Sequence, residues 1–344
     1  MAAQWREYFL ILTAATAVQA QDRPCNRASS ESLQNEGAVA MRARDYPLAQ
    51  KHFTEAFAAC PENHSILLEL ARAEVSGRNF EAAIRTSKQY LASNPESTAG
   101  RLALANAYFM ALKLKEALAE ADSIVRDHPS EAAALKIKAN AAYLLNDVET
   151  AKSTFIQLLD RYPNEEDGAY MLGRIYYQEG FVDLAMGQFE RILKRNPSSY
   201  KALDNLGLCD EARGDYDAAT RHFLAAIKLV EKDHPEYEWP YTNLADLLLK
   251  TGDPERAFDA AAKAANRNPM SARSFYVGAK ALHRLGKTEL ALNWLERSAA
   301  LDPTSSETWY LLGMVYRKLQ QNGKAEEATR TFRELKAREP ARRR

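Results

Sequence analysis

The chain has 344 residues, a length that suits two or three ordinary domains or one long array of repeats. Its 46 basic and 46 acidic residues cancel, so bulk charge gives no support for binding to nucleic acid or to an anionic membrane. The low numbers of glycines and prolines, 14 and 13, favour helix over sheet and predict an all-α fold.

The first twenty residues have the pattern of an export signal. The apolar run Tyr8–Val18 is too short to span a bilayer, and the small residues of Val18-Gln19-Ala20 suit cleavage by signal peptidase. Because the positive charge before this run is weak, a buried or frayed N-terminal helix is the alternative. We expect a signal peptide over residues 1–20, a linker over 21–29, and an exported protein, periplasmic or secreted, that is not stably inserted in a membrane after cleavage.

Prolines recur at a fixed interval through the rest of the chain. A step of 34 residues separates Pro61, Pro95, Pro129, Pro163 and Pro197, and the same step separates Pro269 from Pro303. Each interval holds two apolar stripes of helical spacing with a turn between them, which predicts a helical hairpin. Two amphipathic helices of about 14 residues cannot cover their own apolar faces, so each hairpin needs copies of itself on both sides.

Small residues recur where the two helices of each hairpin are expected to cross. The second helices carry an alanine near their start, at Ala49, Ala83, Ala117, Ala151, Ala185, Ala219, Ala257, Ala291 and Ala325. Four residues later an aromatic fills the gap in several hairpins, at Phe53, Phe155, Phe189 and Phe223. The facing site on the first helix is small as well, as at Gly173, Gly207 and Gly313. Side chains this small let two helices approach closely.

The turns inside the hairpins follow the same register. Gly180, Gly214, Gly252 and Gly286 end the first helices of four hairpins, and Asn146 takes their place in a fifth. Glycine and asparagine are the residues that best adopt the left-handed backbone that ends a helix. We therefore expect a positive φ at these positions.

Together these residues resemble the tetratricopeptide repeat, whose pattern is W-x2-L-G-x2-Y, then A-x3-F, then P. The best matches are Trp309, Leu312, Gly313 and Tyr316 for the first half and Ala185, Phe189 and Pro197 for the second. The resemblance covers residues 30–337 and implies a right-handed superhelical solenoid of nine stacked antiparallel hairpins. The repeats are expected to start near residues 30, 64, 98, 132, 166, 200, 238, 272 and 306.

Two stretches depart from the pattern. Between the sixth and seventh repeats, Glu231–Trp239 holds four extra residues, which predicts a longer helix end, a loop and a bend in the array. The last repeat has Ala337 in place of the proline, and we expect its outer face to be polar because no hairpin follows to cover it. The side chains that support this are Arg330, Arg333, Glu334 and Lys336. Residues 338–344 are expected to form a basic, frayed tail.

Three cysteines remain after the expected signal. Cys25 lies just before the first helix of the first hairpin, and Cys60 lies at the end of its second helix. An antiparallel hairpin brings these two ends together, so a disulfide between them is reasonable in an oxidising compartment, with two free thiols as the alternative. Cys209 lies inside a helix near a packing face, and we expect a buried, unreactive thiol there.

The sequence offers no catalytic site. Its six histidines are scattered without an HExxH pair or another metal-binding spacing, and there is no Gly-rich phosphate loop and no GxSxG motif. The carboxylates are distributed over polar helix faces, where a solvated surface is a simpler interpretation than a catalytic pair. Because the repeats take up the chain, we expect no enzymatic activity, no metal site and no cofactor.

The resemblance instead implies a binding role. In this family the first helix of each hairpin lines a concave groove that takes an extended or helical segment of a protein partner. The groove residues implied for this chain are Asn106, Phe109, Met110, Lys136, Asn140, Tyr143, Tyr170, Arg174, Tyr177, Arg273, Lys280, Arg284 and Arg317. Asn106 and Asn140 stand one repeat apart and resemble the asparagine ladder with which some relatives hold a peptide backbone. Ordinary polar helix surface is the alternative for this pair.

The charge of the groove is expected to change along the array. Asp204, Glu211 and Asp246 make the sixth and seventh repeats acidic, whereas the basic residues of the last two repeats suit an acidic peptide or a C-terminal carboxylate. A solvated surface is the alternative for the basic group, and the clamp residues of chaperone-binding relatives are absent. The sequence thus predicts a non-enzymatic protein-binding scaffold of the cell envelope. An RNA-binding helical repeat is the alternative, although the zero net charge and the export signal argue against it.

Overall fold

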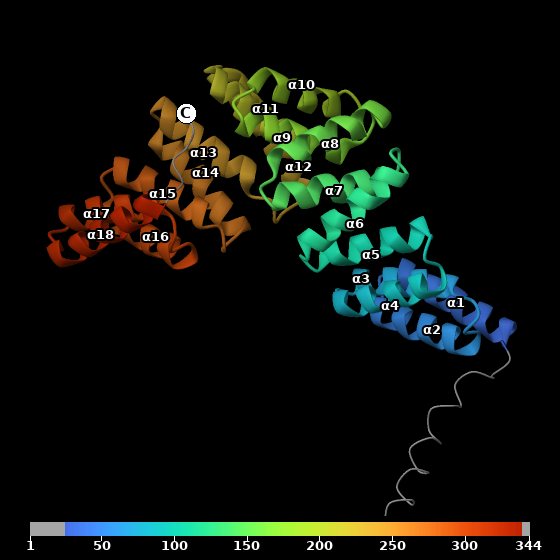
Figure 1. Cartoon of the computed structure of the whole chain (residues 1–344). Coiled ribbons are helices and arrows are strands. Elements are labelled where there is room, and N and C mark those ends of the chain that lie inside the picture. The colour runs from blue at the N-terminus through green and yellow to red at the C-terminus, as the bar shows by residue number, and fades with distance from the viewer. Residues whose placement is uncertain (1–24, 339–344) are drawn as a thin grey trace, which may run out of the picture. The chain divides into compact units, whose positions relative to one another are not determined.

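The computed structural model describes residues 25–338, and within this range every regular element is an α-helix (Figure 1). The predicted all-α fold is therefore confirmed. The helices are α1 Arg27–Arg42, α2 Tyr46–Ala59, α3 Ser65–Ser76, α4 Phe80–Ser93, α5 Thr98–Met110, α6 Leu114–Asp127, α7 Ala132–Leu144, α8 Val148–Arg161, α9 Glu166–Gln178, α10 Val182–Leu193, α11 Tyr200–Arg213, α12 Tyr216–Asp233, α13 Trp239–Thr251, α14 Pro254–Arg267, α15 Ala272–Arg284, α16 Thr288–Leu301, α17 Ser306–Lys318 and α18 Asn322–Arg338.

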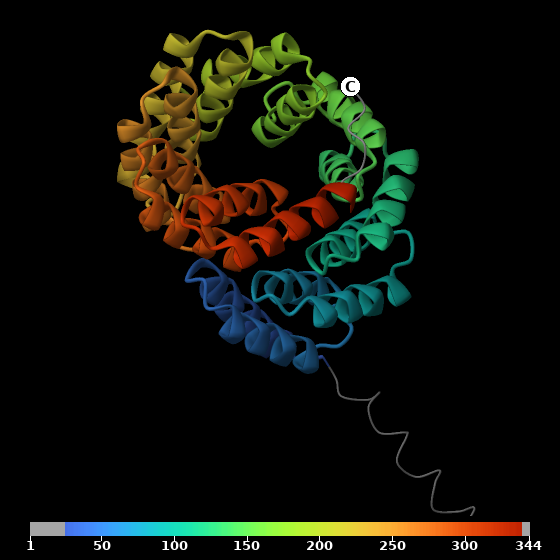
Figure 2. The same cartoon turned by 90° about the vertical axis from the view of Figure 1, so that its left-hand side faces the viewer.

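The helices pair into nine hairpins, which fall into two compact halves. The N-terminal half ends at Glu165 and holds α1 to α8, and the C-terminal half begins at Glu166 and holds α9 to α18. Within each half the second helix of a hairpin packs on the first helix of the next one (Figure 2). First helices also contact one another, as α3, α5 and α7 do in the N-terminal half. Each half is thus a stack of hairpins with its first helices in one layer.

Short polar side chains begin many of these helices. Asp45, Asp147, Asp215 and Asp253 precede second helices, and each carboxylate accepts a hydrogen bond from a backbone N–H in the first turn, at distances of 2.9–3.2 Å. Ser97 and Ser305 cap first helices in the same way. Such caps satisfy backbone donors that would otherwise lack a partner. They explain why the helices restart promptly after such short turns.

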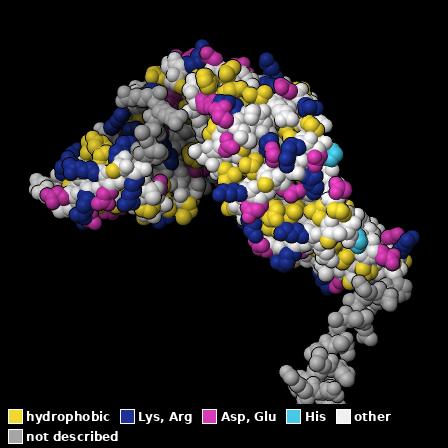
Figure 3. Space-filling view, viewed as in Figure 1, with side chains coloured by type: hydrophobic (Ala, Val, Ile, Leu, Met, Phe, Trp, Pro, Cys, Tyr) yellow, Lys and Arg dark blue, Asp and Glu magenta, His cyan; other side chains and the backbone are white. Residues whose placement is uncertain are grey.

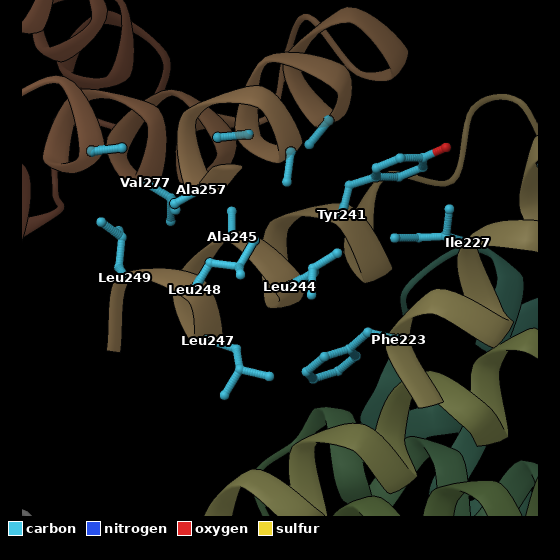
Figure 4. Packing of buried hydrophobic residues seen from close by; sticks show 14 of the residues in the cluster. Phe223, Ile227, Tyr241, Leu244, Ala245, Leu247, Leu248, Leu249, Ala257 and Val277 are labelled. Carbon is cyan, nitrogen blue, oxygen red and sulfur yellow. The ribbon is translucent and has the colours of Figure 1, made fainter. Parts of the chain in front are cut away.

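The predicted small sites are where the helices of a hairpin meet. Ala185 and Ala219 are fully buried, and so are the rings of Phe189 and Phe223. A Cβ atom added to Gly207 would lie 2.5 Å from the ring of Phe223, closer than such atoms approach in proteins. Phe223 in turn belongs to a core cluster that continues through the aliphatic residues of α13 (Figure 4). The absence of a side chain at this glycine therefore makes room for the ring on which the hairpin packs.

The turn between the helices of each hairpin has a left-handed residue. The prediction is confirmed at Asn146 and at the glycines 180, 214, 252 and 286, whose φ angles lie between 62° and 90°. Four further residues have φ angles of 58–61° at the equivalent turns, although their side chains disfavour this backbone. These are Arg44, Arg78, Leu112 and Gln320. The register of the repeats, rather than residue type, decides the conformation here.

The ends of the array differ slightly from expectation. Helix α1 begins at Arg27 with Asn26 as its cap, so residues 27–29 are helical and not part of a linker. Helix α18 includes Arg338, which was expected to open the tail. Arg333 is exposed on α18, whereas the residues one and two repeats earlier, Ala299 and Ala265, are buried. The last hairpin therefore has the polar outer face that was predicted. The expected signal peptide and the rest of the tail lie outside the described residues.

The insertion between the sixth and seventh repeats lengthens α12 to 18 residues and adds a loop before α13. The ring of Tyr200, at the start of α11, lies 4.4 Å from that of His234 and 4.8 Å from that of Tyr237, as measured between ring centroids. Tyr237 also packs against the core of this half. The extra residues thus give a longer helix end and a loop, as predicted, and the loop packs on the neighbouring repeat.

The cysteines have two different environments. Cys25 and Cys60 form a disulfide with a Cα–Cα distance of 4.2 Å, which ties the start of α1 to the end of α2. Cys209 is a free, buried cysteine, and burial raises the pKa of its thiol to about 12. A thiol with so high a pKa is almost never ionised at neutral pH, which makes it unreactive. Among the described residues, no helix has the length and apolar character that a membrane span requires.

Candidate peptide-binding groove

A cavity of about 600 Å³ opens on the layer of first helices in the N-terminal half. Helices α3, α5 and α7 line it, one from each of three consecutive repeats. Most of its lining is apolar, and the residues that contribute are Leu68, Ala71, Val75, Ala99, Leu102, Ala103, Ala133 and Ile137. Four of these eight are alanines, whose short side chains leave room for the hollow. We call it the apolar cavity.

Asn106 lies in the lining of the apolar cavity and is the polar residue best placed to bind a ligand there. Its side chain is exposed, and its amide has no hydrogen-bond partner within residues 25–338. An amide can donate and accept at once, which suits the backbone of an extended peptide. Asn140 differs, because its Nδ2 donates to the carbonyl oxygen of Lys136 at 2.8 Å and the residue is not part of the lining. The two asparagines of the expected ladder are therefore not equivalent.

The charged residues around the apolar cavity are already paired. Lys136 Nζ lies 2.6 Å from a carboxylate oxygen of Glu165, and Arg72 lies 3.7 Å from Glu69 on the same helix. Lys136 was expected to be a groove cation, and it is held by this ion pair. The cavity thus presents an apolar floor, one open amide and charges that cancel locally.

Apolar side chains continue beyond the cavity toward the ends of α5 and α7. Met110, Leu112 and Leu144 are 41%, 74% and 53% exposed. The expected groove residues Phe109 and Tyr143 precede Met110 and Leu144 directly in the sequence and are partly buried. The expected groove residues did not include Leu112, Leu144 or the alanines of the cavity floor. A count of large apolar residues expected at the surface would have found the two leucines.

The expected groove residues of the fifth repeat are part of the packing in the C-terminal half. The ring of Tyr170 lies 6.1 Å from that of Phe189, and Arg174 stacks over Tyr170 at 5.9 Å. Asn205 donates to the hydroxyl of Tyr170 at 3.4 Å. Burial raises the pKa of both Tyr170 and Tyr177. These three residues belong to the C-terminal half, whereas Asn106 and the apolar cavity belong to the N-terminal half.

Asp204 was expected to make the groove acidic, and the structure instead buries it. The residue is only 2% exposed. Its carboxylate accepts one hydrogen bond, from Asn243 at 2.9 Å. Burial raises the pKa of this carboxyl to about 7, and the nearby Glu238 adds to the effect. The expectation of a surface charge at this position was therefore wrong. The reason is the insertion, since the loop brings Tyr237 and Glu238 close to this carboxylate.

The basic residues of the last two repeats are largely satisfied within the protein. Asp246 forms ion pairs with both Arg273 and Lys280, the latter at 3.9 Å, and Arg273 also lies 3.6 Å from Glu307. Arg284 donates to the carbonyl oxygen of Leu249. The remaining residue of the set, Arg317, donates to the hydroxyl of Thr329 at 3.1 Å. The acidic and basic repeats thus neutralise each other where they meet.

Comparison with known proteins agrees with the repeat pattern. Sequence models of the tetratricopeptide repeat match residues 35–98, 68–132, 102–166 and 242–306 in one case, 198–270 in a second and 294–328 in a third. The Protein CTR9 homolog of Arabidopsis thaliana is 26% identical over 109 residues, which are 32% of this chain and only 10% of that protein.

Solved structures show the same arrangement of helices. A chain of the APC/C hetero-tetramer Cut9-Hcn1 has a TM-score of 0.62 at 18% identity, over 83% of this chain and 56% of that one. A tetratricopeptide repeat protein from Parabacteroides merdae has a TM-score of 0.52 at 20% identity, over 84% of this chain and 99% of its own. At these identities the likeness shows the fold alone. With repeat matches over more than half of its length and the corresponding stack of helical hairpins, the chain belongs to the tetratricopeptide repeat family.

Proposed function

We propose that the protein is a non-enzymatic scaffold that binds an extended segment of a protein partner across α3, α5 and α7. A large apolar side chain of the partner would enter the apolar cavity, and its backbone amide would pair with Asn106. The observation that carries the proposal is the combination of an apolar hollow of about 600 Å³ with an open side-chain amide in its lining.

The chemistry of the cavity favours an uncharged anchor over an acidic one. Burial of one large apolar side chain contributes about 1.5–3 kcal/mol, and a well-formed hydrogen bond to Asn106 contributes about 1 kcal/mol. An acidic side chain would instead lose its hydration beside a carboxylate, since Lys136 is already paired with Glu165. The anchor is thus a residue such as leucine, methionine or phenylalanine.

The paired charges also weigh against the RNA-binding alternative. A helical repeat that binds RNA needs a basic surface that follows the phosphate backbone. In the C-terminal half, Arg273, Lys280 and Arg284 are bound to Asp246, Glu307 and a backbone carbonyl. In the N-terminal half, Lys136 is bound to Glu165. These cations therefore already have intramolecular partners, which makes them less available to the phosphates of an RNA.

We further propose that the protein acts outside the cytoplasm, in the cell envelope or beyond. The disulfide between Cys25 and Cys60 supports this, because such bonds persist in oxidising compartments. The apolar run Tyr8–Val18 and the small residues at its end, which resemble a signal peptide, also support export. Cell fractionation with antibody detection tests this location, and a protein found only with the cytoplasmic marker would contradict it.

A peptide-binding experiment tests the proposed site. Peptides enriched from a random display library against the wild-type protein would be titrated by fluorescence anisotropy. Ala103→Trp fills the apolar cavity, and we expect it to weaken binding at least tenfold. Asn106→Ala removes one hydrogen bond, and we expect a loss of about fivefold. Ala58→Trp adds the same side chain at an exposed position of α2 and should leave the affinity unchanged. Peptides that bind Ala103→Trp as tightly as the wild type would exclude this cavity as the site.

A further inference from the structure

A second hollow, of about 400 Å³, lies on the last hairpin, where the end of α17 meets α18. Arg317, Arg330 and Arg333 line it, together with Glu326 and Thr329. In Figure 3, Lys and Arg side chains lie interspersed with Asp and Glu side chains over α17 and α18. We call this hollow the arginine pocket. It belongs to the C-terminal half, whereas the apolar cavity belongs to the N-terminal half.

The guanidinium group of Arg317 is held at the pocket by the neighbouring helix. It donates to Thr329 Oγ1 at 3.1 Å, and that hydroxyl donates to the carbonyl oxygen of Ala325 at 2.7 Å. The hydroxyl group is thereby fixed as an acceptor for the arginine. A guanidinium group with one edge held in this way keeps its other N–H groups in a defined direction.

The other two arginines have no anionic partner in the part of the chain that the structure describes. Neither Arg330 nor Arg333 takes part in an ion pair or a hydrogen bond there, and Glu326 is unpaired as well. This contrasts with Arg273, one repeat earlier, which lies between Asp246 and Glu307. The lining of the hollow thus holds three positive charges against the one negative charge of Glu326, and a bound anion would reduce the repulsion among the arginines.

The exposure of α18 does not by itself explain why three arginines line this hollow. Residues equivalent to Arg333 in the two preceding repeats are the buried Ala299 and Ala265, whereas this position is exposed on α18, which favours a polar residue there. A single lysine, glutamate or glutamine would meet that need. The lining of the hollow instead contains three arginines, one of which is anchored through Thr329.

We propose that the arginine pocket binds a phosphate monoester in its dianionic form. Three guanidinium groups offer more N–H donors than a carboxylate has oxygens to accept them, whereas a phosphate has three terminal oxygens and about twice the charge. Arginine is also the residue whose planar donor pair fits phosphate best. The monoester belongs either to a free small molecule or to a phosphorylated side chain of a protein.

Isothermal titration calorimetry of the full-length protein tests the proposal, with inorganic phosphate and an acetylated phosphoserine pentapeptide as probes. At low ionic strength we expect saturable binding of phosphate with a dissociation constant of about 1 mM, and weaker binding of acetate at matched chloride. Tighter binding of the phosphopeptide would identify a protein as the source of the group. Equal binding of the two probes would identify a free small molecule.

A pair of charge-matched variants separates a specific pocket from bulk attraction. Arg330→Gln with Arg333→Gln should weaken phosphate binding at least tenfold. Lys194→Gln with Arg195→Gln removes the same charge from an exposed turn of the same half, and should change binding less than twofold. Circular dichroism checks that both variants are folded. The proposal is overturned by an absence of saturable binding to either probe, or by equal losses in the two double variants.

Discussion

The turn residues of the nine hairpins share a left-handed backbone but differ in how well they tolerate it. Among the described residues, four are glycines and one is Asn146, whereas Leu112 has φ 58° and a side chain that is 74% exposed. A leucine in this conformation is strained, because its Cβ approaches the following carbonyl oxygen. Its exposure means that it gains little from burial in return.

We therefore expect Leu112→Gly to stabilise the N-terminal half by about 1 kcal/mol. The matched change Asn146→Gly should have a smaller effect, because asparagine already tolerates this backbone. Urea unfolding followed by circular dichroism measures both changes as shifts of the midpoint. A lower midpoint for Leu112→Gly would show that the exposed leucine makes a stabilising contact.

The buried carboxyl of Asp204 should make the stability of the C-terminal half depend on pH. Its pKa is raised to about 7 in the folded protein from an ordinary value of 3.8. A group whose folded pKa is raised contributes stability below its unfolded pKa, and that contribution is lost as the pH rises through the folded value. The expected loss between pH 4 and pH 8 is roughly 3–4 kcal/mol.

Asp204→Asn removes this charge and keeps a side chain that can bond to Asn243. We expect the variant to melt at a higher temperature than the wild type at pH 8 and at about the same temperature near pH 4, the unfolded pKa of the carboxyl. Differential scanning calorimetry across this range makes the comparison. A parallel pH dependence in the two proteins would show that Asp204 does not titrate in this window.

At the scale of the helix, one glycine is needed for packing and another is not. Gly207 faces the ring of Phe223 at a distance that leaves no room for a Cβ atom, whereas a Cβ on Gly187 would have no neighbour within 4 Å. Both glycines lie inside helices of the C-terminal half, α11 and α10. Their helix propensities are the same, so the difference between them isolates packing.

We expect Gly187→Ala to stabilise the protein by about 0.5–1 kcal/mol through helix propensity alone. Gly207→Ala should destabilise it by about 1–2 kcal/mol, because the cost of displacing the ring of Phe223 exceeds that gain. Thermal and urea unfolding of the two variants, side by side, measure the difference. Equal stabilisation by both substitutions would mean that the ring moves freely and that the glycine is not required.

Much of each helical element could be predicted, because the signals are local. The proline step, the alanine near each second helix and the glycines 180, 214, 252 and 286 fix the hairpin and its turn. The conformation of Arg44 or Leu112 could not be read from residue type, since it follows from the position of the turn within the repeat. The burial of Asp204 depends on where the inserted loop lies, which no local pattern encodes.

At the scale of the molecule, the first helices of the two halves carry different side chains on their surfaces. The N-terminal half presents the apolar cavity with Asn106, and the C-terminal half presents charged residues that pair between successive repeats, as Asp246 does with Arg273 and Lys280. The family pattern implied Asn106 as a groove residue, and Asn106 lies in the lining of the apolar cavity. It could not show the cavity, whose shape depends on how three alanine-rich helix faces meet, nor which groove cations would find an internal partner.

Site-specific photocrosslinking in cells tests the central proposal most directly, because it reports whether a partner contacts the cavity in the native setting. A benzoylphenylalanine replaces Leu102 in the lining of the apolar cavity or, as a control, Ala58 on the exposed face of α2. We predict a discrete crosslinked protein from position 102 that is absent from position 58 and is lost when Ala103→Trp fills the cavity. Crosslinks of equal yield and identity at both positions, or crosslinks that persist after the cavity is filled, would contradict a partner bound across α3, α5 and α7.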